Sequence, residues 1–319
     1  MLSPEKISDL ISEAIASISY PAQPAGLYAP IEYTLESGGK RLRPQLTLAV
    51  CSALGCDPQR AIDAALGIEI FHNFTLLHDD VMDSADIRRG RPTVHKRWND
   101  NTAILSGDAM LTMAVEYIAR TPADVMPQAL ALFNRTAMEV YEGQQYDMDF
   151  EQSNDVTVAQ YIEMIRLKTS VLLGCACRMG AIIGGASEDV AQAFYNYGVD
   201  LGLAFQLRDD WLDTYGDPLV FGKQIGGDII NAKKTWLLIN ALTECRTELL
   251  DILAEDLVDE ERIAQVKAVY DRLKLADRCN ALIAEYAQRA IKSVEQIDIP
   301  QAAKEYFITL AQQSIGRNH

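Results

Sequence analysis

Two acidic segments of this chain have the residue types and spacing of metal-binding sites. Each segment closes an apolar run with the pattern of a buried helix, 61–77 in the first case and 197–207 in the second. The carboxylates are Asp79, Asp80 and Asp83 in the first segment and Asp209, Asp210 and Asp213 in the second. Grouped carboxylates repel one another and are costly to remove from water, so they need a positive partner. A hard divalent cation such as Mg²⁺, which shares its oxygen ligands with substrate phosphates, meets that need.

The repetition of the acidic pattern favours one of two interpretations. Residues three and four apart share one face of a helix, so Asp79 and Asp83 lie on one stripe, as do Asp209 and Asp213. One such segment could be a solvated acidic helix end. Two copies, each closing an apolar helix, instead predict two carboxylate clamps that face each other across a cavity and grip a pyrophosphate through metal ions.

A basic segment near the amino terminus has the composition of a phosphate site. Gly38 and Gly39 can end a helix and bring backbone amides close to a ligand, and Lys40, Arg41 and Arg43 follow them. Alone, this segment could equally be a solvated basic helix cap. Together with the acidic segments, it predicts a phosphate cradle.

Four more residues could take part in the same chemistry. His72 lies on the helix stripe of the first acidic segment, although a lone histidine on an apolar helix is more often part of the core. Lys168 and Thr169 lie inside an expected helix just before an apolar run, where a buried lysine needs an anionic partner. Lys223 lies on the glycine-containing loop 215–227, which is suited to closing over a substrate and excluding water.

Long stretches of helical periodicity must position these residues. The chain has 319 residues and no Pro/Gly/Ser-rich linker, which favours one all-helical domain over residues 1–319. Asp57 and Pro58 are expected to begin the helix of the first acidic segment. Thr157 and Gln160 form a capping box that is expected to open the helix of Lys168.

Composition excludes several classes of function. The net charge of −16 argues against nucleic acid as a partner. The six cysteines lack metal-site spacing and are expected to be free thiols of a reducing compartment. The amino-terminal residues lack the apolar core of a signal peptide, and the apolar stretch 170–185 is short for a membrane span and contains Arg178. We therefore expect a cytoplasmic protein without a membrane span.

In combination, order and spacing, these segments resemble the motifs of the trans-isoprenyl diphosphate synthases, or polyprenyl synthetases. The two acidic segments match the two DDxxD motifs of that family, and Gly38–Pro44 matches its isopentenyl diphosphate-binding motif. The resemblance implies an all-α isoprenoid synthase fold, a helical bundle around a central cavity, and a homodimer. It implies a Mg²⁺-dependent condensation of isopentenyl diphosphate with an allylic diphosphate, which would be dimethylallyl, geranyl or farnesyl diphosphate.

The resemblance also implies roles for single residues. It places isopentenyl diphosphate against Lys40, Arg43, His72 and Arg89. It places the allylic diphosphate against Arg88, Lys168, Thr169, Lys223 and Lys233, with Gln206 near the allylic cation. It assigns the metal ions, about three Mg²⁺ per active site, to Asp79, Asp80, Asp83, Asp209, Asp210 and Asp213. Gln144 and Asp147 match a further family motif, although they could be an ordinary helix end.

Two phenylalanines bear on the length of the product. Phe71 and Phe74 precede the first motif, which has no insertion, and this arrangement resembles the short-chain synthases that make C15 to C20 products. Both could instead be plain core residues. We predict geranylgeranyl diphosphate (C20) as the product, with farnesyl diphosphate (C15) as the alternative. A class I terpene cyclase shares the fold, but Asp213 and the basic segment argue against that class.

Overall fold

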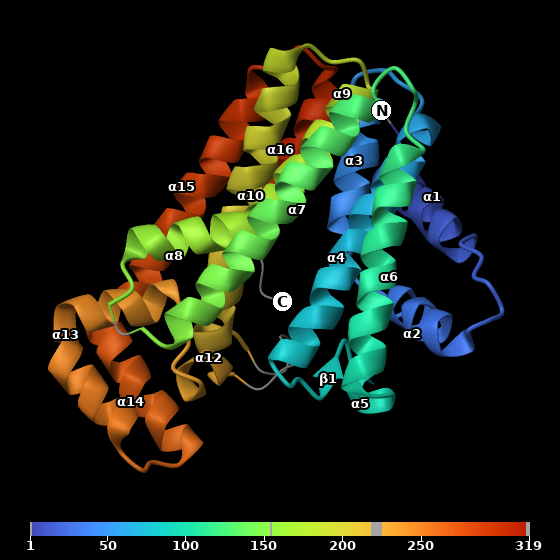
Figure 1. The fold of residues 1–319 in the computed structure, drawn as a ribbon. Helices are drawn as coiled ribbons and strands as arrows, with labels where there is room; N and C mark the ends of the chain where they lie inside the picture. Colours follow the sequence, from blue (N-terminus) through green and yellow to red (C-terminus); the bar gives the residue numbers. More distant parts are fainter. Residues whose placement is uncertain (1, 154, 218–224, 317–319) are drawn as a thin grey trace. The chain divides into compact units, whose positions relative to one another are not determined.

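The computed structural model describes residues 2–153, 155–217 and 225–316, and these are almost entirely helical (Figure 1). The helices in the first part of the chain are α1 (Pro4–Ala16), α2 (Ala25–Leu35), α3 (Leu42–Ala53), η1 (Pro58–Ala61), α4 (Ile62–Met82), α5 (Val94–Arg97) and α6 (Asp100–Ala119). Those that follow are α7 (Met126–Glu151), α8 (Val158–Ile165), η2 (Arg166–Ser170), α9 (Val171–Ile183), α10 (Glu188–Tyr215), α12 (Gly227–Ile230), α13 (Trp236–Ala254), α14 (Asp259–Arg272), α15 (Leu275–Glu295) and α16 (Gln301–Gly316). A hairpin of two short strands, β1 (Ile87–Arg88) and β2 (Arg91–Pro92), is the only sheet among the described residues.

The chain forms two compact units. Unit 1 comprises Met1–Arg135 and Cys175–Phe194, and unit 2 comprises Thr136–Gly174 and Tyr195–His319. The helices α7, α9 and α10 each contribute residues to both units. The expectation of a single domain over residues 1–319 stays a prediction.

Helix α4 lies at the centre of unit 1, where it packs between α3 and α6 (Figure 1). Twelve of its 21 residues are buried, which explains why the sequence there is apolar on nearly every face. Gly67 allows α6 to approach closely, because a Cβ atom at this position would lie 2.9 Å from the carbonyl oxygen of Ala114. Asp57 accepts a hydrogen bond from the backbone N–H of Gln59 and so caps the short η1 turn that leads into α4.

Helices α8 and α9 of the Lys168 region are joined by the single π-helical turn η2, which the periodicity of the sequence does not predict. The expected capping box is present, since Thr157 and Gln160 each bond to the other's backbone N–H. Such π turns occur preferentially at functional sites, and this one contains Lys168 and Thr169.

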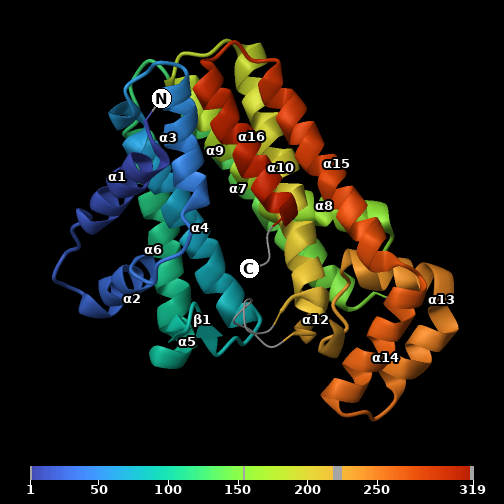
Figure 2. The same ribbon diagram turned by 180° about the vertical axis from the view of Figure 1, so that it is seen from behind.

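Helices α13, α14 and α15 contribute to the hydrophobic core of unit 2, and α16 packs beside α15 (Figure 2). Helix α13 is bent at Cys245, where φ is −136° and ψ is 45°. Tyr197 of α10 donates a hydrogen bond of 2.9 Å to the backbone oxygen of Phe307, and their rings meet edge to face at 5.4 Å. These contacts fix α16 against α10.

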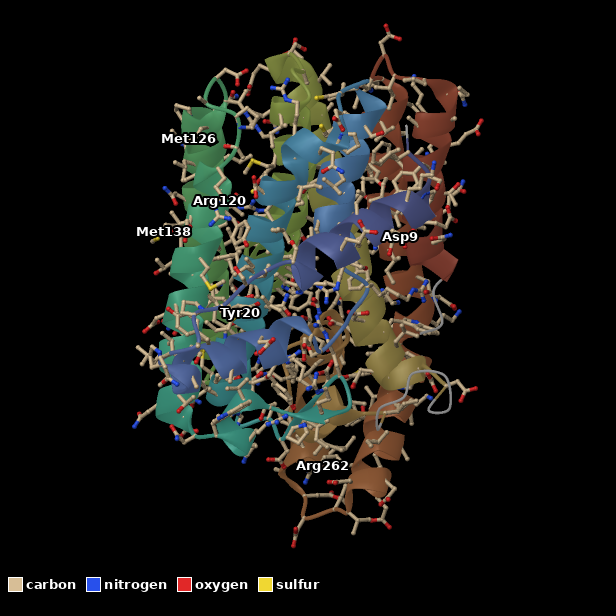
Figure 3. The ribbon with its side chains drawn as sticks, turned by 90° about the vertical axis from the view of Figure 1, so that its right-hand side faces the viewer. Asp9, Tyr20, Arg120, Met126, Met138 and Arg262 are labelled. Atoms are coloured by element: carbon tan, nitrogen blue, oxygen red, sulfur yellow. The ribbon has the colours of Figure 1, made fainter. Side chains whose placement is uncertain are left out.

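Helix α7 is amphipathic: Phe133 is buried, whereas the side chain of Met138 is 57% exposed and points outward (Figure 3). None of the described helices combines the length and apolar character that a membrane span requires. All six cysteines are free thiols, as expected.

Candidate active site

The three carboxylates of the first acidic motif have different environments at the end of α4. Asp80 is only 5% exposed, and its Oδ1 accepts a hydrogen bond of 2.7 Å from Nε of Arg88. Burial raises the pKa of Asp80, and the Arg88 guanidinium opposes that rise. Asp79 is half-buried, and Asp83, the C-cap residue of the helix, is exposed. Asp79 and Asp83 are thus more accessible to solvent and ligands than Asp80.

Two adjacent arginines in the hairpin after α4 contact different partners. Arg88 ends strand β1, whereas Arg89 and Gly90 form the two-residue turn with φ values of 52° and 73°. Positive φ at both central residues is the requirement of a type I′ hairpin turn. Arg89 Nη1 donates to Ser37 Oγ at 3.2 Å, to the backbone oxygen of Gly38 and to Asn73 Oδ1 at 3.3 Å. The hairpin therefore lies between the first acidic motif and the basic segment.

Aromatic contacts hold this hairpin against α2. The ring of Tyr33 lies between the guanidinium groups of Arg91, at 3.9 Å from the ring centroid, and Arg97, at 4.3 Å. Tyr33 also donates a hydrogen bond of 2.8 Å to the backbone oxygen of Pro92. Because Tyr33 is itself buried, the position of the hairpin is coupled to the core of unit 1.

The basic segment folds into a turn that requires its glycines. Gly38 and Gly39 have φ values of 78° and 122°, and Arg41, also with positive φ, precedes α3. A Cβ atom at Gly39 would lie 2.9 Å from Cζ of Arg89, so a side chain there would displace that guanidinium. Lys40 is exposed beside this contact.

Arg43 and His72 form a direct pair beneath the turn. Arg43 Nη1 lies 3.1 Å from His72 Nε2, and because an arginine can only donate, Nε2 is the acceptor. His72 is therefore neutral, with its proton on Nδ1. Burial and the charges of Arg43, Arg89 and Arg88 lower the pKa of His72 well below its usual value, in agreement with a neutral imidazole. Burial also lowers the pKa of Arg43 to about 10.

Two residues to which the sequence assigned no role lie behind these cations. Glu69 Oε1 accepts a hydrogen bond of 2.9 Å from Asn73 Nδ2 and lies 3.8 Å from Arg41 Nη1. Both Glu69 and Asn73 are buried. Their spacing of four residues on one helix was the available signal, but it does not reveal which cations surround them.

In unit 2, Lys168 has the anionic partner that its burial demands. Its Nζ lies 2.7 Å from Oδ2 of Asp147, which projects from α7. Gly143, one turn earlier, makes this close packing possible, since a Cβ atom there would lie 2.7 Å from the carbonyl carbon of Leu167. The motif that contains Gly143 and Asp147 thus positions Lys168.

A chain of hydrogen bonds joins Thr169 to the second acidic motif. Thr169 Oγ1 donates to Gln206 Oε1 at 3.2 Å, and Gln206 Nε2 donates to Asp210 Oδ1 at 3.1 Å. Tyr161 donates its hydroxyl proton to the other oxygen of Asp210. Burial, followed by the nearby charge of Asp228, raises the pKa of Asp210 to about 7. Sequence reasoning missed Tyr161, because its partner lies 49 positions away.

The remaining residues of the second motif face the short helix α12. Asp213 Oδ2 accepts a hydrogen bond of 2.9 Å from the backbone N–H of Asp228, while Asp209 is half-buried. Lys233 follows α12, and its charge opposes the rise in the pKa of Asp210 that burial causes. Lys223, on the expected closing loop, lies outside the described residues.

Phe71 and Phe74 are both buried in unit 1. Phe71 meets Phe74 at a centroid distance of 5.6 Å and Phe133 edge to face at 5.2 Å, and the ring of Phe74 lies 4.8 Å from that of His78. These contacts agree with the core interpretation of Phe71. Phe74, one turn closer to Asp79, stays a candidate for the end of the product pocket.

The donor set suits magnesium bound jointly with a phosphorylated substrate. Within residues 2–153, 155–217 and 225–316, no three His, Cys, Asp or Glu side chains converge into a complete metal site. Mg²⁺ usually binds one or two carboxylates and completes its shell with water and substrate phosphates. Two pairs of aspartates suit this mode of coordination: Asp79 and Asp83 in unit 1, and Asp209 and Asp213 in unit 2. Asp80 and Asp210 are more deeply buried than these four and accept hydrogen bonds from Arg88, Tyr161 and Gln206.

Comparison with known proteins adds independent information. A family model described as polyprenyl synthetase matches residues 24–273. The chain is 38% identical to the geranylgeranyl pyrophosphate synthase of Geoglobus acetivorans over 97% of both sequences. It is 36% identical to the geranylgeranyl diphosphate synthase of Methanosarcina mazei over 98% of this chain and 96% of that protein.

Solved structures agree with this assignment. A crystal structure of a geranylgeranyl pyrophosphate synthase matches the whole of both chains with a TM-score of 0.95 at 44% identity. The corresponding synthetase of Pyrococcus horikoshii matches with a TM-score of 0.92 at 32% identity, over 98% of this chain and 97% of that one. The all-α isoprenoid synthase fold expected from the sequence is confirmed. The chain therefore belongs to the polyprenyl synthetase family of trans-prenyltransferase enzymes.

Proposed function

We propose that this enzyme condenses isopentenyl diphosphate with an allylic diphosphate to form geranylgeranyl diphosphate. The observation that carries the proposal is the divergence of Arg88 and Arg89. Arg88 binds the first acidic motif through Asp80, and Arg89 binds the basic turn through Gly38. This condensation needs two adjacent diphosphate sites, one that uses metal and one that uses protein side chains alone.

The isopentenyl diphosphate site comprises Lys40, Arg43, His72 and Arg89, all in unit 1. Lys40 and the two arginines supply positive charge to the diphosphate, and neutral His72 offers its Nδ1 proton as a hydrogen-bond donor. These contacts hold the double bond of the substrate where the allylic cation forms, so their contribution is positional.

The allylic diphosphate site uses Arg88, Lys168, Lys223 and Lys233 to stabilise the charge of the departing pyrophosphate. Asp79, Asp83, Asp209 and Asp213 would hold Mg²⁺, about three ions per site. Bound Mg²⁺ would add positive charge opposite the leaving group. Thr169 and Gln206 direct their dipoles towards the cation, and the released pyrophosphate accepts the final proton.

A C20 product is supported over C15 by the names of the relatives. Proteins from Geoglobus acetivorans, Methanosarcina mazei and Saccharolobus solfataricus, at 36–38% identity, are named geranylgeranyl synthases. A relative from Natronomonas pharaonis at 36% identity is named a geranylfarnesyl synthase, so overall identity does not fix chain length. Phe74 is the residue of this chain proposed to limit it.

A product assay tests the proposal. The purified protein is incubated with Mg²⁺, isopentenyl diphosphate and, in separate reactions, dimethylallyl, geranyl or farnesyl diphosphate. The prenyl alcohols obtained after phosphatase treatment are identified by mass spectrometry. We expect geranylgeraniol from each primer, no product after EDTA, and a homodimer by light scattering. A cyclic terpene formed from a single allylic substrate would instead indicate a cyclase.

A further inference from the structure

Glu69 is a buried carboxylate for which the proposed reaction has no direct use. It lies in the middle of α4, ten residues before Asp79, and only 2% of its surface is exposed. A buried charge is costly unless it is paired and hydrogen-bonded, so Glu69 needs cationic and hydrogen-bonding partners. The surrounding residues provide both.

The charges of three guanidinium groups act on the carboxylate. Arg41 Nη1 lies 3.8 Å from Glu69 Oε1, and the charges of Arg43 and Arg89 also act on it. Burial raises the pKa of Glu69, and the hydrogen bond from Asn73 and the three arginines oppose that rise. Burial lowers the pKa values of Arg43 and Arg89, and the charge of Glu69 opposes that lowering. Glu69 thus offsets the mutual repulsion of the basic cluster.

Asn73 connects this carboxylate to the hairpin. Its Nδ2 donates to Glu69 Oε1 at 2.9 Å, while its Oδ1 accepts from Arg89 Nη1 at 3.3 Å. The other side of the cluster is held by Arg41, whose Nη2 donates to the backbone oxygen of Leu35 at 2.7 Å. The end of α2, the basic turn and the hairpin therefore all connect to α4 through Glu69 and Asn73.

We propose that Glu69 is a positioning residue that, through Asn73 and Arg41, holds the arginines of the isopentenyl diphosphate site in their binding geometry. This inference rests on the proposed function, since it concerns the site that receives isopentenyl diphosphate. Glu69 lies beneath the cations and does not contact the substrate.

Positioning and simple charge balance make opposite predictions. If Glu69 only weakened the positive field of the site, its neutralisation would strengthen the binding of an anionic substrate. If Glu69 holds the arginines in place, its neutralisation weakens binding, because the guanidinium groups repel one another and lose their fixed directions.

The test compares Glu69→Gln, Asn73→Ala and the control Ile68→Val. Ile68 is a buried neighbour on α4 without polar contacts, so its variant reports general loosening of the helix. We expect Glu69→Gln and Asn73→Ala to raise the KM for isopentenyl diphosphate about tenfold, while the KM for the allylic substrate changes less than about twofold. Ile68→Val should leave both KM values unchanged.

Several results would overturn the inference. These are an unchanged or lowered KM for isopentenyl diphosphate in Glu69→Gln, an effect of equal size on both substrates, or no effect of Asn73→Ala. Where turnover is low, the affinity of each folded variant for isopentenyl diphosphate can be measured directly by isothermal titration calorimetry. A wild-type protein that forms no prenyl product would refute the proposed function itself, which is a separate outcome.

Discussion

Gly143 packs directly against the backbone of Lys168. A Cβ atom at Gly143 would lie 2.7 Å from Cα of Lys168, a separation that side chains do not tolerate. The contact sets the distance between α7 and the π turn η2, and Asp147, one turn further along α7, then reaches the Lys168 ammonium. The position of Lys168 therefore depends on the absence of a side chain at Gly143 on the neighbouring helix.

Replacement of Gly143 by alanine should lower both stability and activity. Overpacking of this kind costs about 1–3 kcal/mol of unfolding free energy, and displacement of Lys168 should reduce kcat by about tenfold or more. Denaturant unfolding and steady-state kinetics measure the two effects. Gly26→Ala is the matched control, because a Cβ atom at Gly26 would have no neighbouring atom within 4 Å and the backbone there does not have a positive φ. Normal turnover in Gly143→Ala would contradict the role assigned to this contact.

Removal of the Tyr161 hydroxyl should weaken magnesium-dependent activity. Asp210 would lose one of its two buried donors, and groups that orient a metal site typically contribute about 10- to 100-fold in metal affinity or activity. We expect Tyr161→Phe to need a higher Mg²⁺ concentration for half-maximal rate. Tyr197→Phe removes another buried hydrogen bond on α10 and should cost similar stability without this shift. Identical Mg²⁺ dependence in both variants would refute the prediction.

The accessible aspartates should be essential for turnover. Asp79→Asn and Asp209→Asn keep the size of the side chains but remove the charge, and we expect kcat to fall about 100-fold or more. Circular dichroism and thermal unfolding should remain close to wild type. Asp108→Asn, an exposed change on α6, controls for net charge. Wild-type rates in either motif variant would eliminate the proposed carboxylate clamp.

Phe74 is predicted to limit the length of the product. Phe74→Ala removes a large side chain one turn before His78, and the extra space should shift the products towards chains longer than C20. Leu66→Ala, two turns earlier on α4, should change stability but not product length. Mass spectrometry of the products distinguishes the two variants, and Phe74→Leu is available if the alanine variant does not fold. An unchanged distribution in both Phe74 variants would leave Phe74 as a core residue only.

Asp200 should make stability depend on pH. Burial raises its pKa to about 6, although Arg289 lies 2.9 Å away. The folded protein therefore binds this proton more tightly than the unfolded chain does. The stabilisation is complete below about pH 4 and is lost as pH rises through about 6.

The variant Asp200→Asn removes this titration. Relative to the variant, the wild type should lose about 1–3 kcal/mol of unfolding free energy between pH 4 and pH 7. Denaturant titrations of both proteins at several pH values provide the measurement. Parallel stability curves across this range would show that Asp200 has an ordinary pKa in the folded state.

The sequence by itself determined the helices, the two acidic motifs and the basic turn. These features depend on interactions between residues close in the chain: helical periodicity, the Thr157–Gln160 capping box and the glycine pair Gly38–Gly39. The proposed chemistry of metal-held pyrophosphate was also suggested by residue types, since two acidic helix ends and a basic glycine turn occur together in one chain. Residue type alone does not distinguish the three aspartates within each motif, because their burial and partners are not visible in the sequence.

Tertiary structure decided which side chains are partners. Arg88 and Arg89 are adjacent residues of the same type, and the positive φ of Arg89 in its hairpin turn helps to direct their guanidinium groups to different partners. Likewise, Asp80 and Asp210 are distinguished from the other motif aspartates by burial against Arg88 and Tyr161. Because such pairings arise from the packing of elements that are distant in the chain, local sequence patterns do not specify them.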